Sequence, residues 1–479
     1  MKLKTLILIA AAVSACVLSC GKSEPSTEND SFTVVFDTAG GLPVPEVQHI
    51  QKGDKASEPE VVPEKEGSLF IGWYTESGLK FNFLSNPITK DITLYARYWS
   101  GPKKYVVIND YDWSYLEESV HNYFGSSEGK DVAVGQGVLM YIFQRSVDTF
   151  KDCIKKHCSM AEKYNIPLLF QLDPTTFWDS VPELWNWWDP AMAGYKESNR
   201  ENVEWTGWGQ ENAVKIGWLN WGSQIRLKPM CNWFSPEYQA AVKARMDTLL
   251  GLIKAWYDSL PDSRKYLLIG VKITGELGMG VNNWYYTGGN DLYDKPASAD
   301  PVSGINMNNK PSRSNGAVST IGYAGLTYSG IKTSGTVSGD DIAALEWKFT
   351  EFVSKIAARY FPRDLIFAHA GGVGNDLDAC DNDYVCPSWS FYGSDATDGS
   401  NASYCMNIIK NSDCPYWGVA EWAISSSRAA DWVSALDNSL KIDRCRFLSV
   451  YTNVIGNNNG TSVNDGAVSG IKQVQNYTY

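Results

Sequence analysis

Histidine is scarce in this chain, and no long apolar segment follows its N-terminal region. The 479 residues include four histidines and no Cys-x-x-Cys pair, so the usual ligand patterns of a zinc site are missing. After the N-terminus no run reaches about 18 apolar residues, the length that a membrane-spanning helix needs. Acidic residues outnumber basic ones by 54 to 42, so no basic stripe is present to neutralise nucleic-acid phosphates. We therefore expect no metal, no cofactor and no nucleic-acid partner.

Aromatic residues are abundant instead. The chain holds 19 Trp and 26 Tyr, and 44% of its residues are hydrophobic against 20% charged. That composition is typical of a globular protein with a large core. Many of the rings are expected to pack in that core, but others could stack on the apolar faces of sugars.

The first residues have the pattern of an export signal. Two lysines precede the apolar run Leu6–Val13, which is too short to span a bilayer. The segment Val17–Gly21 resembles a bacterial lipobox, in which Cys20 becomes the lipidated first residue, with Cys16 as the alternative. We expect a signal peptide over 1–20, a linker over 21–31, and an exported lipoprotein held at a membrane by its N-terminal lipid. The outer membrane, the cell surface and the periplasm are all compatible with that anchor.

Eight further cysteines follow Cys20. In an exported protein they can oxidise, and two sequence-neighbouring pairs, Cys380 with Cys386 and Cys405 with Cys414, are close enough to staple loops. Unpaired buried thiols are the alternative, since connectivity cannot be read from a sequence.

Residues 32–99 predict a small β module. Phe32–Gly41 ends in a Gly-Gly turn, Phe70–Thr75 carries Gly-Trp-Tyr-Thr, and Asp91–Tyr98 closes with Leu-Tyr-Ala-Arg-Tyr. In this order the three segments resemble the Listeria–Bacteroides repeat, also called the internalin-type B repeat. Members of that family usually carry Trp where Tyr98 stands. The resemblance implies a β-grasp-like module with a spacer or adhesive role.

From about residue 104 to 479 the pattern changes to strands that alternate with amphipathic helices. This alternation predicts an α/β fold with a parallel sheet. Eight strands make a closed (β/α)8 TIM barrel the most economical architecture. The expected strands are 105–110, 132–140, 166–173, 266–274, 365–370, 388–392, 416–420 and 447–451.

Two glutamates follow the fourth and seventh predicted strands. Active sites of such barrels lie at the carboxyl ends of the strands, where Glu276 and Glu421 are expected. The arrangement resembles the 4/7 superfamily of retaining glycoside hydrolases. The resemblance implies that Glu276 is the acid/base and Glu421 the nucleophile, because retention needs one carboxyl to protonate the leaving oxygen and a second to attack the anomeric carbon.

One residue departs from that superfamily. Its members usually carry Asn directly before the acid/base, whereas Gly275 stands here. Either Asn282 or Asn283 supplies the missing contact, or the chain is a divergent member. An inverting glycosidase is a further alternative.

Other polar and aromatic residues near the strand ends are candidate substrate ligands. The long segment 174–235, which follows the third predicted strand and is called the excursion below, holds nine of the 19 tryptophans. We expect it to form a lid whose rings bind sugars. The alternative is a lid whose rings pack only on one another. The remaining candidates for substrate binding are Asp173, Asn282, Asn283, Trp284, His369, Trp389, Tyr392, Trp417 and Trp422.

Together these features predict a glycoside hydrolase that acts on oligo- or polysaccharides, with β-linked hexosides suggested by the superfamily alone. The rival hypothesis is a catalytically inactive barrel that binds glycans or serves adhesion, and the repeat-like module is the feature that supports it.

The lipobox leads to the first prediction. Cys20→Ala should release the protein from the membrane fraction or leave an uncleaved precursor, because the thiol that carries the lipid is gone. Metabolic labelling with a radiolabelled fatty acid should mark the wild type and the Cys16→Ala control but not the Cys20 variant. Equal labelling of the Cys20 variant would move the modification to Cys16 or exclude it.

Overall fold

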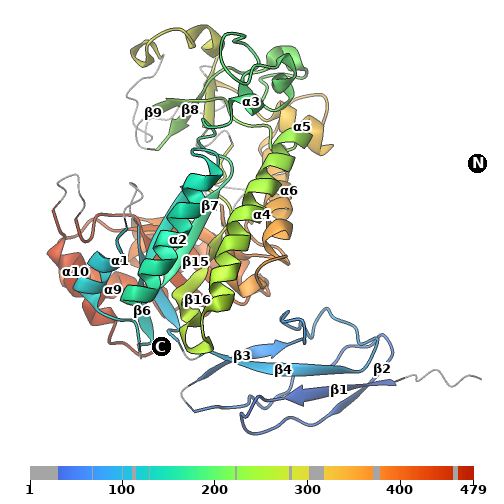
Figure 1. The fold of residues 1–479 in the computed structure, drawn as a ribbon, viewed down its shortest axis with the longest axis vertical. Helices are drawn as coiled ribbons and strands as arrows, with labels where there is room; N and C mark the ends of the chain where they lie inside the picture. Colours follow the sequence, from blue (N-terminus) through green and yellow to red (C-terminus); the bar gives the residue numbers. More distant parts are fainter. Residues whose placement is uncertain are drawn as a thin grey trace, which may run out of the picture.

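A computed structural model describes residues 31–66, 68–99, 101–109, 115–128, 130–221, 224–279, 283–300, 318–370, 378–456 and 462–479. Figure 1 shows three parts: a small sheet, a barrel surrounded by helices, and a second small sheet at the far end of the barrel. Within the described ranges, no helix is both long and apolar enough to cross a membrane.

The N-terminal module is a four-stranded sheet in the order β2-β1-β4-β3. Its strands are β1 (Ser31–Asp37), β2 (Gln48–Gln51), β3 (Leu69–Tyr74) and β4 (Ile92–Trp99). β1 and β4 pair in parallel, and the other pairs are antiparallel. Phe36 and Trp73 meet edge to face at 4.8 Å in its core. The Tyr98 hydroxyl donates to the carbonyl of Thr38 at 2.8 Å, so the residue that departs from the repeat pattern ties the end of β4 to the Gly-Gly turn.

Eight parallel strands form the closed barrel, which confirms the predicted fold. β16 pairs with β5 and so joins the last strand to the first. In barrel order the strands are β5 (Lys104–Ile108), β6 (Val132–Tyr141), β7 (Leu168–Asp173), β10 (Leu268–Lys272), β13 (Ile366–Ala370), β14 (Cys386–Tyr392), β15 (Trp417–Ala423) and β16 (Cys445–Val450).

Amphipathic helices cover the barrel, and their ends have clear chemical causes. The main ones are α1 (Glu117–Phe124), α2 (Val147–Tyr164), α4 (Pro236–Ser259), α6 (Gly339–Ala357), α8 (Ser403–Asn411), α9 (Ala429–Leu440) and α10 (Asp465–Val474). Ser146 caps α2 by accepting from the Thr149 amide, and Ser235 caps α4 in the same way through Tyr238. Each cap satisfies an amide that the first helical turn leaves without a partner.

The excursion after β7 contributes to a second sheet that the sequence did not reveal. The antiparallel strands β8 (Gly217–Asn220), β9 (Gln224–Leu227), β11 (Asn283–Tyr286) and β12 (Val318–Ser319) lie in the order β12-β11-β8-β9. With four residues or fewer, these strands are too short for periodicity to mark them. Figure 1 shows β8 and β9 beyond the ends of α2 and α4, opposite the N-terminal module.

All eight cysteines that follow the signal region are buried, and none of them forms a disulfide. Neither of the two pairs that are close in sequence forms a disulfide. The structure therefore agrees with the alternative prediction, which was buried thiols. Burial raises the pKa of the Cys158 and Cys445 thiols, which keeps them protonated and unreactive at neutral pH.

The module packs against the amino-terminal face of the barrel. The Tyr74 hydroxyl donates to Asp364 Oδ2 at 3.1 Å, and the Asn82 amide donates to Asp413 Oδ2 at 3.3 Å. Tyr74 is 1% exposed, and burial together with Asp364 raises its pKa well above the ordinary value. Since Asp364 and Asp413 precede barrel strands, the contact lies at the end of the barrel opposite the carboxyl ends of the strands.

This interface yields the second prediction. Tyr74→Phe should lower the free energy of unfolding by about 1 kcal/mol, because it removes one buried hydrogen bond and keeps the ring. Urea unfolding measures that loss, while kcat/KM stays unchanged, since the contact is remote from the carboxyl ends of the strands. Leu84→Ala, at a side chain that is 76% exposed on the same module, is the control. A fall in kcat/KM of tenfold or more would show that the module acts on the site.

Candidate active site

The two predicted glutamates line one cavity at the carboxyl ends of the barrel strands. The cavity has a volume of about 490 Å³ and is lined by Leu139, Tyr141, Asp173, Trp221, Ile225, Lys272, Gly275, Glu276, Tyr392, Glu421 and Tyr451. Glu276 follows β10, whereas Glu421 lies within β15 rather than beyond it. The fourth and seventh barrel strands thus supply two carboxylates to a shared space.

Glu421 owes its direction to an irregularity in β15. The pairing with β14 shifts between Val419, which faces Trp389, and Glu421, which faces Ser390, so Ala420 has no partner in that register. The pairing with β16 shifts at the same place. Such an extra residue turns the following side chains relative to the regular alternation, a device often found beside active sites.

Two hydroxyl groups donate to the same oxygen of Glu421. Ser390 Oγ lies 3.3 Å from Oε2, and the Tyr392 hydroxyl bonds to that oxygen as well. These two bonds hold the carboxylate group of Glu421 in a fixed position. A fixed carboxylate suits a nucleophile, which must point at one carbon atom.

A buried histidine sets the direction of the Ser390 hydroxyl. Burial, reinforced by Lys272, lowers the pKa of His369 well below its ordinary value, so the ring is neutral. Its Nδ1 accepts from Lys272 Nζ at 3.4 Å, which places the ring proton on Nε2, 2.9 Å from Ser390 Oγ. The serine then accepts from His369 and keeps its own hydrogen for Glu421.

Lys272 brings a positive charge to the floor of the cavity. The residue is 2% exposed. Burial lowers the pKa of its ammonium group, and Glu421, Asp173 and Glu276 oppose that effect. Sequence reasoning missed this residue, although a lysine inside the apolar run of β10 is a usable signal, because lysine is almost never fully buried without a polar role.

The predicted aromatic ligands are mostly in the core rather than around the cavity. Trp284, Trp389, Trp417 and Trp422 are each 4% exposed or less. Trp422 Nε1 donates to the carbonyl of Ala396 and packs on Trp432. We expected these four indoles at the sugar, but their rings fill space between strands and helices.

The other predicted ligands divide into those at the cavity and those away from it. Asp173 and Tyr392 line the cavity, and His369 lies behind it as part of the network below Glu421. Asn283 begins β11 and pairs with Leu219. Asn282 and Cys20 lie outside the described residues.

Most indoles of the excursion are also packed inside it. Six of the nine, Trp178, Trp185, Trp187, Trp205, Trp218 and Trp233, are 7% exposed or less. Trp178, Trp185 and Trp187 each donate to a backbone carbonyl. These rings therefore agree with the alternative prediction of a lid that packs on itself.

Trp221 is the member of that group that lines the cavity. It lies nearly parallel to Tyr141, with ring centroids 6.4 Å apart and an interplanar angle of 28°. Phe177 supports Tyr141 edge to face at 4.8 Å. Tyr141 and Trp221 thus form an aromatic wall of the cavity, of the kind on which a sugar face can stack.

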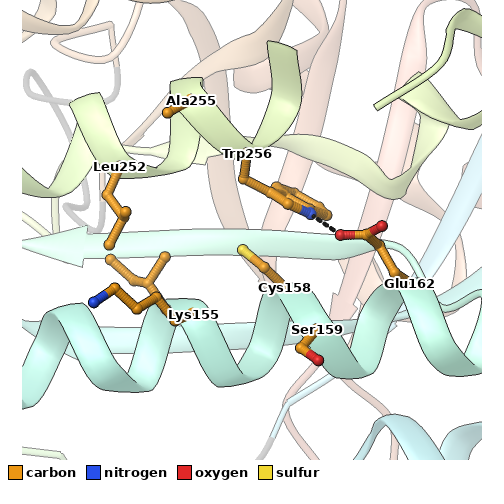
Figure 2. Close-up of a pocket in the computed structure, with 8 residues that line it drawn as sticks. Lys155, Cys158, Ser159, Glu162, Leu252, Ala255 and Trp256 are labelled. Carbon is orange, nitrogen blue, oxygen red and sulfur yellow. Dashed lines mark hydrogen bonds between the residues drawn. The ribbon is translucent and has the colours of Figure 1, made fainter. Parts of the chain in front are cut away.

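A second hollow lies outside the barrel between α2 and α4 (Figure 2). Its one carboxylate, Glu162, accepts from Trp256 Nε1 at 2.9 Å. Its lining lacks a second acidic group, so the arrangement does not provide an acid and a base. The cavity at the barrel mouth is the candidate active site.

The N-terminal module matches a known family. Residues 32–97 match the Listeria-Bacteroides repeat domain family, which confirms that prediction. Over 73 residues the chain is 40% identical to a protein named as a Gly-rich membrane protein of Evansella cellulosilytica. That match takes up 15% of this chain and 8% of the relative, so the chain spans under a tenth of its relative's length.

Solved structures with a similar fold include glycoside hydrolases. A family 5 enzyme from Prevotella bryantii B14 has a TM-score of 0.39 and 8% identity, over 78% of this chain and 96% of that chain. A beta-galactosidase from Marinomonas ef1 has a TM-score of 0.41 and 8% identity, over 78% and 59%. These likenesses concern the fold.

The third prediction separates the two kinds of indole. Trp221→Ala should raise KM for a glycoside about fivefold, the equivalent of roughly 1 kcal/mol of lost stacking, with little change in stability. Trp218→Ala should instead lower the free energy of unfolding by about 3–5 kcal/mol, because it empties a fully buried site. Steady-state kinetics and urea unfolding of both variants measure the split. Unchanged KM in the Trp221 variant would exclude the aromatic wall from binding.

Proposed function

We propose that this chain is an exported lipoprotein glycoside hydrolase that cleaves β-linked hexosides with retention. The observation that carries the proposal is the shared cavity of Glu276 and Glu421, in which Glu421 accepts from two hydroxyl groups. These donors hold Glu421 in position as the nucleophile, and Glu276 lines the same cavity as the acid/base. Neighbouring aromatic rings offer a surface for the sugar.

In this mechanism Glu421 attacks the anomeric carbon as Glu276 gives its proton to the leaving oxygen. The glycosidic C–O bond breaks, and a covalent bond forms between the sugar and Glu421. Glu276, now ionised, then takes a proton from water, whose oxygen attacks the same carbon and releases Glu421. Ser390 and Tyr392 hold the nucleophile in place throughout.

The proposed domain layout follows from the same features. A signal peptide over 1–20 and a linker over 21–31 lead to the repeat module over 32–99 and the catalytic barrel over 104–479. The lipid on Cys20 would hold the protein at the outer membrane, at the cell surface or in the periplasm. The module would act as a spacer, because it is docked at the barrel face remote from the cavity.

A glycan-binding barrel without activity is the second candidate, and the repeat module favours it. An inverting mechanism, with a water activated by one of the two glutamates, is the third. Variants at Glu421 and Glu276 distinguish these three candidate functions.

The fourth prediction concerns the two glutamates. Glu421→Ala should abolish turnover of every glycoside, because no covalent intermediate can form, and azide or formate should restore part of it. Glu276→Ala should lower kcat/KM by about 10²–10⁴-fold for a substrate with a poor leaving group. It should spare dinitrophenyl glycosides in the first step, since dinitrophenolate leaves without a proton.

Glu128→Ala, at an exposed glutamate, is the control and should match the wild type. NMR detection of the first product decides the stereochemistry: a retained anomer supports the proposal, and an inverted one replaces the mechanism. A wild type that binds glycans but turns over no chromogenic glycoside would favour the binding barrel.

A further inference from the structure

Asp173, the last residue of β7, places its two carboxylate oxygens in different surroundings. Oδ1 accepts from the Thr175 amide at 2.7 Å, the Thr175 hydroxyl at 2.8 Å and the Thr176 amide at 3.2 Å. Oδ2 has no hydrogen-bond donor among the residues that the structure describes. The side chain is 3% exposed and lines the cavity. The turn therefore fixes the carboxylate and leaves Oδ2 as an acceptor.

Gly275 lets this carboxylate lie directly against the backbone that leads into Glu276, the acid/base candidate. A Cβ at residue 275 would overlap both Oδ2 and Cγ of Asp173. Any other residue would push the carboxylate away from the backbone that leads into Glu276. Glycine at this position is thus explained by close approach, and Asp173 fills the space that a side chain there would take.

Lys272 ends the neighbouring strand β10 and lines the same cavity as Asp173, whose charge acts on its ammonium group. Its register partner is Gln171, two residues before Asp173 on β7. An ammonium group has three N–H donors, and in the described part of the chain Lys272 has one hydrogen-bond partner, His369. Lys272 also lines the cavity, so further donors are available to a molecule bound there.

We propose that Asp173 and Lys272 are a specificity pair that reads two neighbouring hydroxyl groups of the sugar held between Glu276 and Glu421. Asp173 Oδ2 accepts from one hydroxyl, and Lys272 donates to the oxygen of the next. The inference rests on the proposed hydrolase function. It restricts the substrate class to sugars whose two adjacent hydroxyls are free, because a deoxygenated or O-substituted position would leave a buried charged group without its partner.

The test uses the nitrophenyl β-hexoside that the wild type cleaves best and its singly deoxygenated analogues. Asp173→Asn keeps the Oδ1 acceptor and the size of the side chain but replaces Oδ2 by an NH2 donor. Lys272→Met keeps the length and removes the donors. Thr175→Val is the matched control, because it removes one hydrogen bond to Oδ1 and leaves Oδ2 untouched.

For the wild type, deoxygenation at two adjacent ring carbons should each lower kcat/KM roughly ten- to hundredfold, as expected for a hydrogen bond to a charged group. Asp173→Asn should lose activity on the parent sugar and no longer distinguish it from one of these two analogues. Lys272→Met should behave in the same way toward the other. The Thr175 variant should keep the full discrimination.

If the Asp173 variant loses kcat/KM equally on every substrate, Asp173 only stabilises the turn after β7. That result would overturn the inference and leave the hydrolase function intact. Sensitivity at two carbons that are not adjacent would overturn the pairing. A wild type that hydrolyses no glycoside at all would overturn the proposed function, and the inference with it.

Discussion

The pairing of β16 with β5 closes the sheet, and the whole site depends on that closure. In an open sheet the fourth and seventh strands would be separated by two intervening strands, and their side chains would face a surface. In the barrel the carboxyl ends of all strands surround one space, so Glu276 and Glu421 share a cavity although 144 positions of sequence, from 277 to 420, stand between them. The hydrophobic side chains that close the sheet thereby also set the distance across which the two carboxylates act.

The polar groups inside this closed space are joined in a chain of hydrogen bonds rather than standing as isolated charges. Lys272, His369 and Ser390 follow one another, and the last donor reaches Glu421. A buried ammonium group without a partner would be costly. Three nearby carboxylates offset that cost for Lys272 without a direct ion pair in the described residues. The same arrangement keeps His369 neutral, so the network has one consistent direction of hydrogen bonds.

The two ends of the barrel serve different purposes. At the amino-terminal face, Tyr74 and Asn82 of the repeat module contact residues that directly precede barrel strands. At the carboxyl face, the excursion and its small sheet contribute Trp221 and Ile225 to the lining of the cavity. The module therefore contacts the barrel at the end opposite the cavity. The proposed role of the repeat as a spacer depends on this separation.

The sequence alone determined the eight strands, most of their helices, the repeat module and the two glutamates. These features depend on local patterns, such as apolar runs of strand length, helical periodicity and short motifs. The tertiary structure decided which rings line the cavity: Trp221 does, whereas Trp417 and Trp422 do not. It also brought Lys272 beneath the carboxylates and Asp173 against Gly275. The positions of Lys272 and Asp173 depend on the register of β10 and β7, and those of Glu421 and Trp422 on the irregularity at Ala420, because a shift of one residue turns a side chain from the core to the cavity.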